Sequence, residues 1–249
     1  MSSSQNKTVY AGIVVIGDEI LSGRTRDINV QQIANFLQPL GVRVGQVQIV
    51  QDVQSDIVEA VKALSQRYDY VFTTGGIGPT HDDITADSIA ACFDRSIGIR
   101  DDAKAILAEW YAKLGDTLTD ARLRMARIPV GADLIDNPVT GAPGFQIENV
   151  FVLAGVPAIV RGMLEDIAHR IEGGAVTHSV TVRLDNVRES EIASQLEALE
   201  QSHDGVSLGS YPFFEDDGAG GFRRGVALVA RGTSPDQLAQ VKEALDRLG

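Results

Sequence analysis

The 249-residue sequence contains one cysteine, Cys92, so an intramolecular disulfide and a zinc site ligated by several cysteines are both excluded. Positive charge is also scarce, because 22 Lys and Arg stand against 34 Asp and Glu and the formal net charge is −12. Nucleic acids and anionic membrane surfaces favour clustered Lys and Arg. We therefore expect neither as the main partner, and an anionic ligand would have to be held by local amides, a metal or a few cations.

Apolar stretches of the roughly 20 residues that a membrane helix requires are missing from the sequence. The first residues, Met1–Lys7, are polar and lack the apolar core of a signal peptide. We expect residues 1–8 to form a disordered tail and the protein to be cytoplasmic. The composition, 44% hydrophobic and 22% charged, is typical of a soluble globular protein.

Strand and helix patterns alternate in the first part of the chain. Apolar β-prone runs predict strands over Val9–Gly17, Val42–Val50 and Tyr70–Thr74, and helical spacing predicts helices over Ile28–Leu40, from Ser55 onward and over Asp83–Phe93. Parallel neighbours in a sheet need crossover connections, which helices supply. The pattern therefore predicts an α/β fold with a doubly wound, mostly parallel sheet.

The rest of the chain divides at the pair Gly173-Gly174. Before it we expect helices over Asp101–Leu114, Asp120–Arg127 and Pro157–Ile171, and one strand over Gln146–Leu153. After it the predicted order is strand Thr177–Leu184, helix Ser190–Ser202, strand Val206–Phe213, strand Gly225–Arg231 and helix Pro235–Leu248. We expect an α/β domain over residues 9–172 and a small α+β domain over residues 175–249.

A glycine-rich turn follows the strand Tyr70–Thr74. Gly75, Gly76 and Gly78 permit positive φ and close approach of a ligand, and Thr80 with Asp83 has the spacing of a capping box at a helix start. Free backbone N–H groups at such a turn attract anions. The sequence therefore predicts that this turn binds phosphate groups.

Carboxylates follow several of the predicted strands. Asp18 and Glu19 follow the first strand, and Asp52 follows the second. Ligands of doubly wound sheets bind beyond the carboxyl ends of the strands, so these groups are expected to converge on the glycine turn. Asp83, Asp82 and Asp52 are candidate ligands of Mg²⁺ and candidate catalytic groups. Alternatively, Asp82 and Asp83 are structural and complement a helix dipole.

With these turns placed, the chain resembles the molybdopterin-binding (molybdenum cofactor biosynthesis) family, and more closely the amino-terminal region of the competence/damage-inducible protein A family. The likeness is carried by Gly17–Gly23 with Asp27-Ile28-Asn29, Gln51-Asp52, Thr74–Thr85, Asn137–Phe145 and Leu153–Pro157. It implies ligand contacts from Asp18, Glu19, Asn29, Thr80, Thr85, Asn137, Gly141, Gly144 and Gly155. The segment Asn137–Phe145 would form a rigid wall for a planar ring.

The resemblance also implies an activity and an assembly. It implies a homo-oligomer that binds a pterin or a nucleotide diphosphate, with Mg²⁺-dependent chemistry at a phosphoanhydride. The adenylyltransferase branch has Arg-Asp where this chain has Asp82-Asp83, whereas the competence-protein branch has Asp-Asp and implies hydrolysis of ADP-ribose-type pyrophosphates. The alternatives are a binding module without catalysis and a molybdopterin adenylyltransferase.

Overall fold

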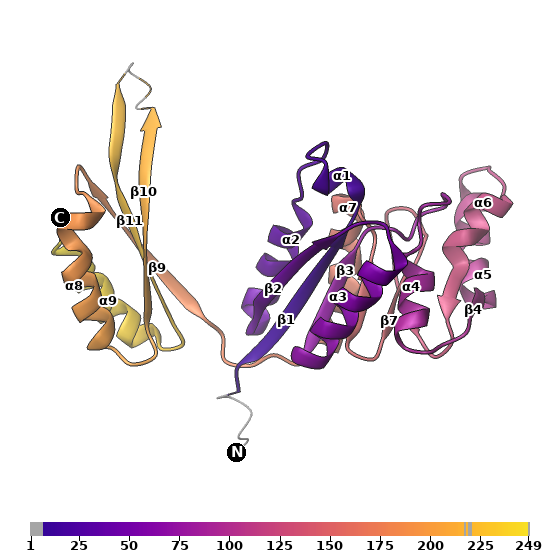
Figure 1. Ribbon diagram of the computed structural model, residues 1–249, viewed down its shortest axis with the longest axis horizontal. Helices are drawn as coiled ribbons and strands as arrows, with labels where there is room; N and C mark the ends of the chain where they lie inside the picture. The colour runs from indigo at the N-terminus through magenta and orange to yellow at the C-terminus, as the bar shows by residue number, and fades with distance from the viewer. Residues whose placement is uncertain (1–6, 217, 219–220, 249) are drawn as a thin grey trace. The chain divides into compact units, whose positions relative to one another are not determined.

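The computed structural model describes residues 7–216, 218 and 221–248, and the chain divides into two compact units between Gly174 and Ala175 (Figure 1). The first unit is built on a six-stranded sheet with the order β2-β1-β3-β8-β7-β6. Its strands are β1 (Val9–Ile16), β2 (Val42–Val50), β3 (Tyr70–Thr74), β6 (Asp133–Ile135), β7 (Gly144–Ile147) and β8 (Val150–Leu153). The pairs β2-β1, β1-β3 and β3-β8 are parallel, and β7 and β6 are added antiparallel.

Helices cover both faces of this sheet (Figure 1). On one face, α2 (Asn29–Leu37) and α7 (Pro157–Ile167) pack on a core that includes Ile13 and Val15. On the other, α3 (Gln54–Arg67), α4 (Thr85–Cys92) and α5 (Asp101–Lys113) pack on a core that includes Val14 and Ile16. Successive side chains of a strand point to opposite faces, so the apolar run of β1 is buried on both sides. The predicted doubly wound, mostly parallel fold is confirmed.

The strand predicted over Gln146–Leu153 is wrong as a single element. The structure divides it into the antiparallel strands β7 and β8, joined at Glu148, which has φ 50°, and Asn149. The Asn149 amide nitrogen donates to the carbonyls of Ser65 and Tyr68, both at 3.0 Å, and so caps the end of α3. The turn contains neither Gly nor Pro, so the continuous β-prone sequence concealed it.

Other predicted helices are shorter or differ in type. Helical residues over Asp120–Arg127 are limited to α6 (Asp120–Leu123) and a 3-10 turn, η3 (Arg124–Ala126), and β5 (Arg127–Pro129) then pairs with β4 (Ile97–Ile99). The helix predicted over Ile28–Leu40 ends its α-helical part at Leu37 and continues as η2 (Gln38–Leu40), which contains Pro39. The helix from Pro157 likewise ends in η4 (Ala168–Arg170). A short helix, α1 (Asp18–Leu21), was not predicted.

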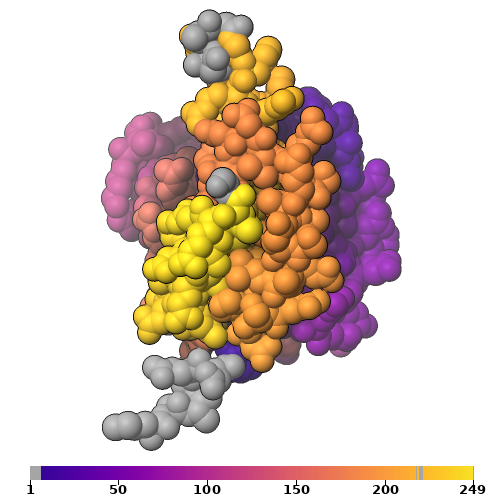
Figure 2. All heavy atoms as spheres, turned by 90° about the vertical axis from the view of Figure 1, so that its left-hand side faces the viewer, coloured from indigo at the N-terminus to yellow at the C-terminus, as the bar shows by residue number. Residues whose placement is uncertain are grey.

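The second unit follows the predicted order β-α-β-β-α. Its elements are β9 (His178–Asp185), α8 (Glu189–Gln201), β10 (Ser207–Asp216), β11 (Phe222–Gly232) and α9 (Pro235–Asp246). The strands form an antiparallel sheet of order β10-β11-β9, and both helices pack on one face of it. Figure 2 looks onto α8 and α9, which lie side by side, and the β10–β11 hairpin extends beyond them.

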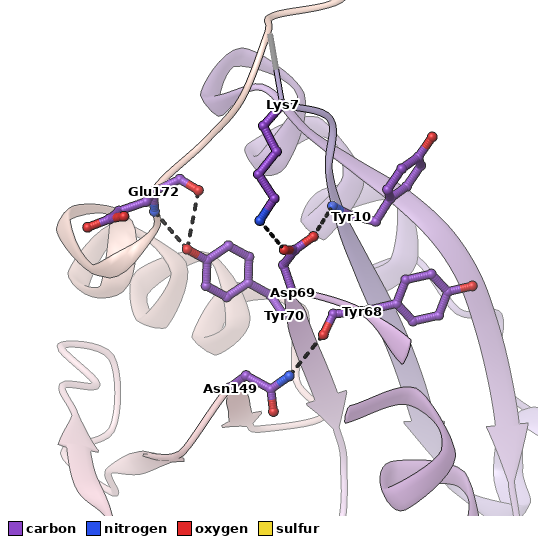
Figure 3. A network of polar contacts seen from close by, with 7 residues as sticks. All are labelled: Lys7, Tyr10, Tyr68, Asp69, Tyr70, Asn149 and Glu172. Atoms are coloured by element: carbon purple, nitrogen blue, oxygen red, sulfur yellow. Dashed lines mark hydrogen bonds and ion pairs between the residues drawn. The ribbon is translucent and has the colours of Figure 1, made fainter. Parts of the chain in front are cut away.

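A polar network holds the chain where it enters and leaves the first unit (Figure 3). Lys7 Nζ donates to Asp69 Oδ1 at 2.7 Å, and the Tyr10 backbone N–H donates to the other carboxylate oxygen at 2.9 Å. The Tyr70 hydroxyl accepts from the Glu172 N–H at 2.9 Å. Residues 1–6 of the predicted tail lie outside the described residues, whereas Lys7 has this ordered contact.

Two glycines at the end of the first unit are needed for close backbone packing. A Cβ on Gly173 would lie 1.5 Å from the Leu40 carbonyl oxygen, and one on Gly174 would lie 2.0 Å from the Lys7 carbonyl oxygen. The Gly174 N–H also donates to the Gly41 carbonyl at 3.2 Å. The segment that leaves the first unit is therefore fixed to it as far as Gly174.

Candidate functional site

A cleft of about 650 Å³ lies at the carboxyl ends of the parallel strands. Residues after β1, β2, β3 and β8 line it, as does the loop before β7. The predicted site residues that line the cleft are Glu19, Asp52, Gly75, Gly76, Gly78, Asp82, Asp83, Asn137 and Gly155. The structure thus brings together segments that are separated by more than a hundred positions in the sequence.

The glycine turn after β3 has a conformation that requires its glycines. Gly75 and Gly76 have φ of 101° and 68°. A Cβ on Gly75 would lie 2.2 Å from the Ile16 carbonyl oxygen, and one on Gly76 would lie 2.1 Å from Thr85 Oγ1. The buried Thr85 hydroxyl donates to the Gly75 carbonyl at 2.9 Å, and the Thr85 N–H donates to the Gly76 carbonyl at the same distance. The first residue of α4 therefore holds the turn in place.

The same turn presents backbone N–H groups that the rest of the protein leaves unpaired. The Gly75 N–H donates to the Leu153 carbonyl at 3.3 Å. Among the described residues, the N–H groups of Gly76, Ile77 and Gly78 donate no hydrogen bond. All three residues line the cleft. Successive free N–H groups in a concave turn form an anion-binding nest, so this part of the cleft can accept phosphate oxygens.

The predicted capping box is wrong. α4 begins at Thr85, its N-cap residue is Ile84, and no side chain caps it. Instead, the backbone N–H and the hydroxyl of Thr80 donate to Asp83 Oδ2, at 2.8 and 2.6 Å, and close a turn before the helix. Hydrogen bonds between Thr80 and Asp83 within the loop compete with helix capping, because both arrangements use the same spacing of three residues. One oxygen of Asp83 is thereby engaged within the loop.

Carboxylates gather on the side of the cleft nearest β1 and β2. The Asp18 backbone N–H donates to Asp52 Oδ2 at 3.0 Å, which joins the segments after the two strands. Burial raises the pKa of Asp52, and the negative charges of Asp18, Glu19 and Asp82 raise it further, although the Asp18 N–H opposes them. The Thr80 hydroxyl and the Asp82 backbone N–H lower the pKa of Asp82.

These carboxylates fit a divalent cation only in part. Within residues 7–216, 218 and 221–248, no group of three or more His, Cys, Asp and Glu side chains is arranged to hold a metal ion. Mg²⁺ is commonly bound by one or two carboxylates together with substrate phosphates and water. Burial is the largest cause of the raised pKa of Asp52, and the repulsion from neighbouring carboxylates that adds to it is the type of conflict that a cation relieves. Asp52 and Asp82 are therefore candidate ligands of a cation whose coordination a substrate phosphate and water would complete.

Several residues that were predicted to contact a ligand make structural contacts within the protein. The buried Asn29 donates its amide to the Gly155 carbonyl at 2.8 Å and joins α2 to the turn after β8. Gly141 packs on the Trp110 indole. A Cβ at this position would lie 2.4 Å from the ring, so the contact requires a glycine. Gly144 begins β7, and a Cβ there would lie 2.5 Å from the Val152 carbonyl oxygen.

Asn137 lines the cleft but also organises its own loop. Its amide nitrogen donates to Thr140 Oγ1 at 2.6 Å and to the Ala142 carbonyl at 2.8 Å, and its side-chain oxygen accepts from the Val139 N–H at 3.0 Å. The residue is 2% exposed. Its hydrogen bonds hold the loop rigid, and Thr140 and Ala142 form part of the cleft wall.

Sequence reasoning missed residues that the additional elements α5 and η3 bring to the site. Tyr111 and Met125 line the cleft. Arg124 lies beside the glycine turn and donates from Nε to the Thr80 carbonyl at 3.2 Å. None of these residues follows a strand of the main sheet. The expectation that ligands bind beyond the carboxyl ends of the strands therefore did not identify them. The adjacent aromatic residues Trp110 and Tyr111 were the available signal.

The fold and the cleft define a doubly wound α/β protein with a candidate small-molecule site at the carboxyl edge of its sheet. Residues 12–173 match the family described as a probable molybdopterin binding domain, and residues 176–248 match the middle domain of FAD synthase. The chain therefore belongs to the molybdopterin-binding domain family and, within it, to the CinA-like proteins.

Individual relatives agree with this placement. A protein of Archaeoglobus fulgidus is 35% identical over 80% of this chain and 84% of its own length. A CinA-like protein of Gemmatimonas aurantiaca is 35% identical over 80% of this chain, which spans 50% of that relative. The crystal structure of the protein CinA from Thermoplasma acidophilum matches with a TM-score of 0.61 and 34% identity, covering 66% of this chain and 99% of that one. Among the described residues, no helix combines the length and apolar character needed to cross a membrane.

Proposed function

We propose that the protein binds a nucleotide diphosphate compound together with a divalent cation and hydrolyses its phosphoanhydride bond. The observation that carries the proposal is the set of unpaired N–H groups of Gly76, Ile77 and Gly78, which line the same cleft as Asp52 and Asp82. Amides alone would attract an anion and carboxylates alone would repel it. A cation held by the carboxylates reconciles the two, because it can contact phosphate oxygens as well.

Each group has a definite role in this proposal. The amides of the glycine turn donate to phosphate oxygens and neutralise the charge that develops during cleavage. Asp82 and Asp83 would hold the cation, with Asp52 either as a further ligand or as the group that accepts a proton. A bound divalent cation supplies charge neutralisation and lowers the pKa of a bound water. Without a cation beside it, burial and neighbouring charges raise the pKa of Asp52, so its carboxylate is suited to accept a proton when it is not itself a ligand of the cation.

Hydrolysis is tested by incubating the purified protein with ADP-ribose and Mg²⁺, Mn²⁺ or Co²⁺ and measuring AMP. We expect release of AMP that stops on addition of a chelator. Asp82→Asn should lower the rate at least about tenfold, because it removes a cation ligand. Asp133→Asn, a change of the same chemistry at an exposed position on β6, should leave the rate unchanged. Absence of AMP with every metal, from a protein whose circular dichroism shows an intact fold, would refute hydrolysis.

A second candidate is a module that binds a pterin or nucleotide without catalysis. It is favoured by the hydrogen bonds from Thr80 to Asp83, which give one oxygen of this carboxylate a structural role. Calorimetry with and without a chelator separates the candidates. Asp83→Asn should abolish metal-dependent binding in the first case, whereas binding in the second case ignores both the metal and the substitution.

A third candidate is adenylyl transfer. The similarity of residues 176–248 to the middle domain of FAD synthase favours a nucleotide-related role of this kind. Transfer would require ATP turnover that depends on a second substrate. Asp82 disfavours it, because a carboxylate replaces the cation that the adenylyltransferase branch has at this position.

A further inference from the structure

Strand β2 lies at one edge of the six-stranded sheet (Figure 1). It pairs with β1 on one side, and no described strand pairs with its other side. Val47 and Ile49 of β2 are 38% and 43% exposed. They lie beside Ile13 and Val15 of β1, so their side chains point to the face of the sheet that α2 covers. This edge therefore exposes an unpaired strand together with apolar side chains.

The surface around this edge is almost free of charge. From Ile28 to Gln51, a range that contains α2 and β2, Arg43 is the single charged residue, whereas 22% of the residues in the whole chain are charged. The two exposed positions of α2 are the amides Gln31 and Asn35. Sheet edges that face water are commonly protected by charged residues, whereas the cores of protein–protein interfaces are depleted of them. The exposed residues of α2 and β2, here called the α2–β2 surface, therefore have the composition of an interface.

The backbone groups at the open edge can be assigned from the pairing of β2 with β1. A bulge at Gly45 limits the regular part of β2 to Gln46–Val50. The Val50 carbonyl accepts from the Gly17 N–H at 3.2 Å, so the backbone groups of Val50 point to the β1 side. Backbone groups of successive residues in a parallel strand point to alternate sides. Those of Val47 and Ile49 therefore point to the open edge, where another strand can bind them.

A second copy of this chain suits the edge because β2 is complementary to itself. Two identical strands can pair antiparallel about a twofold axis. With the axis at Gln48, Val47 of each copy lies opposite Ile49 of the other, and their outward backbone groups can exchange hydrogen bonds. Shifting the axis by half a residue places one of these two side chains opposite Gly45 or Gln51 instead. The register at Gln48 therefore pairs both exposed apolar residues with each other.

Charge also favours a contact at this surface over a contact elsewhere. Each copy has a net charge of −12, so two copies repel each other. The α2–β2 surface is a place where they can meet without bringing carboxylates together. A standard interface buries roughly 800 Å² per partner, more than the regular part of one edge strand supplies. Because α2 packs on the face to which Val47 and Ile49 point, its exposed amides would enlarge the contact.

From these observations we infer that the α2–β2 surface binds a second copy of the chain. The two β2 strands pair antiparallel about a twofold axis at Gln48 and join the two six-stranded sheets into one sheet of twelve strands. Val47 and Ile49 form the apolar contacts across the axis, and the α2 helices lie on the same face of the joined sheet. The inference is independent of the proposed phosphate site and of hydrolysis.

Sedimentation equilibrium of the full chain measures the dimer and its dissociation constant. We expect the wild type to form a dimer with a Kd of about 10 µM or lower, as interfaces of standard size do. Val47→Lys and Ile49→Lys should each raise the Kd about 100-fold or more, because each places two like charges beside the axis. Val130→Lys and Ile99→Lys are the matched controls, at exposed positions outside α2 and β2, and should leave the Kd unchanged.

A disulfide cross-link tests the register and does not depend on the folding of the lysine variants. In a Cys92→Ala background, Gln48→Cys places the two thiols at the axis as a non-hydrogen-bonded pair, with Cα atoms about 4.5 Å apart. Oxidation with diamide should therefore link the two copies. Gln46→Cys is the control, because the two Gln46 positions are offset by four residues, roughly 13 Å. It should stay unlinked, since a disulfide requires Cα atoms within about 7 Å.

Three results would overturn the inference. The first is a wild-type chain that remains monomeric at about 100 µM, well above the expected Kd, which would leave this edge to a different partner. The second is a dimer whose Kd is unchanged by Val47→Lys and Ile49→Lys in proteins that circular dichroism shows to be folded, since the interface would then lie elsewhere. The third is a cross-link in Gln46→Cys but none in Gln48→Cys, which would exclude the twofold axis at Gln48.

Discussion

Substitution of Gly76 by alanine tests how the glycine turn is held. Gly76 has φ 68°, and a Cβ at this position would lie 2.1 Å from the Oγ1 of the buried Thr85. Gly131 also has a positive φ, 85°, but a Cβ there would meet nothing within 4 Å. Gly131→Ala therefore reports the backbone cost alone, and Gly76→Ala adds the displacement of Thr85.

The magnitudes follow from these contacts. An alanine in the left-handed region costs about 1–2 kcal/mol, which is the effect we expect for Gly131→Ala. Loss of the Thr85 hydrogen bond to Gly75 costs about 1–3 kcal/mol, so Gly76→Ala should lower the free energy of unfolding by about 2–5 kcal/mol. Thr85→Ala removes the same hydrogen bond and the same steric conflict. The double variant should therefore be less destabilised than the sum of the single variants by about 1–3 kcal/mol.

Urea unfolding measures these differences in the first unit alone, because Trp110 is the single tryptophan of the chain and its fluorescence reports on that unit. Equal destabilisation by Gly76→Ala and Gly131→Ala would refute the steric reasoning. So would strictly additive effects of Gly76→Ala and Thr85→Ala, since contacting residues that share one hydrogen bond must couple.

Two further substitutions test the electrostatics of the cleft and the end of the first unit. Ionised Asp52 destabilises the fold because its pKa is raised, so Asp52→Asn, which can still accept from Asp18, should raise the free energy of unfolding at pH 7 by about 0.5 kcal/mol. The gain should vanish at about pH 2, well below the ordinary pKa of an Asp carboxyl, where the group is protonated in both states; thermal unfolding at both pH values measures it. Gly174→Ala should cost about 1–3 kcal/mol in the same urea assay, because its Cβ would meet the Lys7 carbonyl, whereas Gly98→Ala, with open space around it, should cost nothing.

Much of the fold could be predicted because its strands and helices have strong periodic signals. β1 is apolar on both faces and β3 leads directly into a glycine turn, so the parallel core followed from pattern alone. The β7–β8 hairpin could not be predicted, because its turn at Glu148 and Asn149 contains neither Gly nor Pro. The short strands β4 to β6 have three residues each, too few for periodicity to identify.

The candidate site, like the fold, could be predicted from the sequence only in part. Glu19, Asp52 and the glycine turn could be placed together, since each follows a parallel strand and the ends of such strands meet. Tyr111 could not be placed there, because its position depends on the packing of α5 against Gly141 over a distance of 30 positions in the sequence. The prediction of a capping box was wrong because Asp83 accepts hydrogen bonds from Thr80 within the loop before α4. The same two residue types at the same spacing can form either a capping box or such a loop turn.

The most direct test of the proposed phosphate site is the response of the backbone amides of Gly76, Ile77 and Gly78 in a ¹⁵N NMR titration with pyrophosphate, with and without Mg²⁺. We predict that these three amide resonances shift on binding and that Mg²⁺ strengthens the effect, while the Gly131 amide, in an exposed turn outside the cleft lining, stays in place. Unchanged resonances of the three amides at saturating pyrophosphate and Mg²⁺ would contradict the assignment of this turn as the phosphate site.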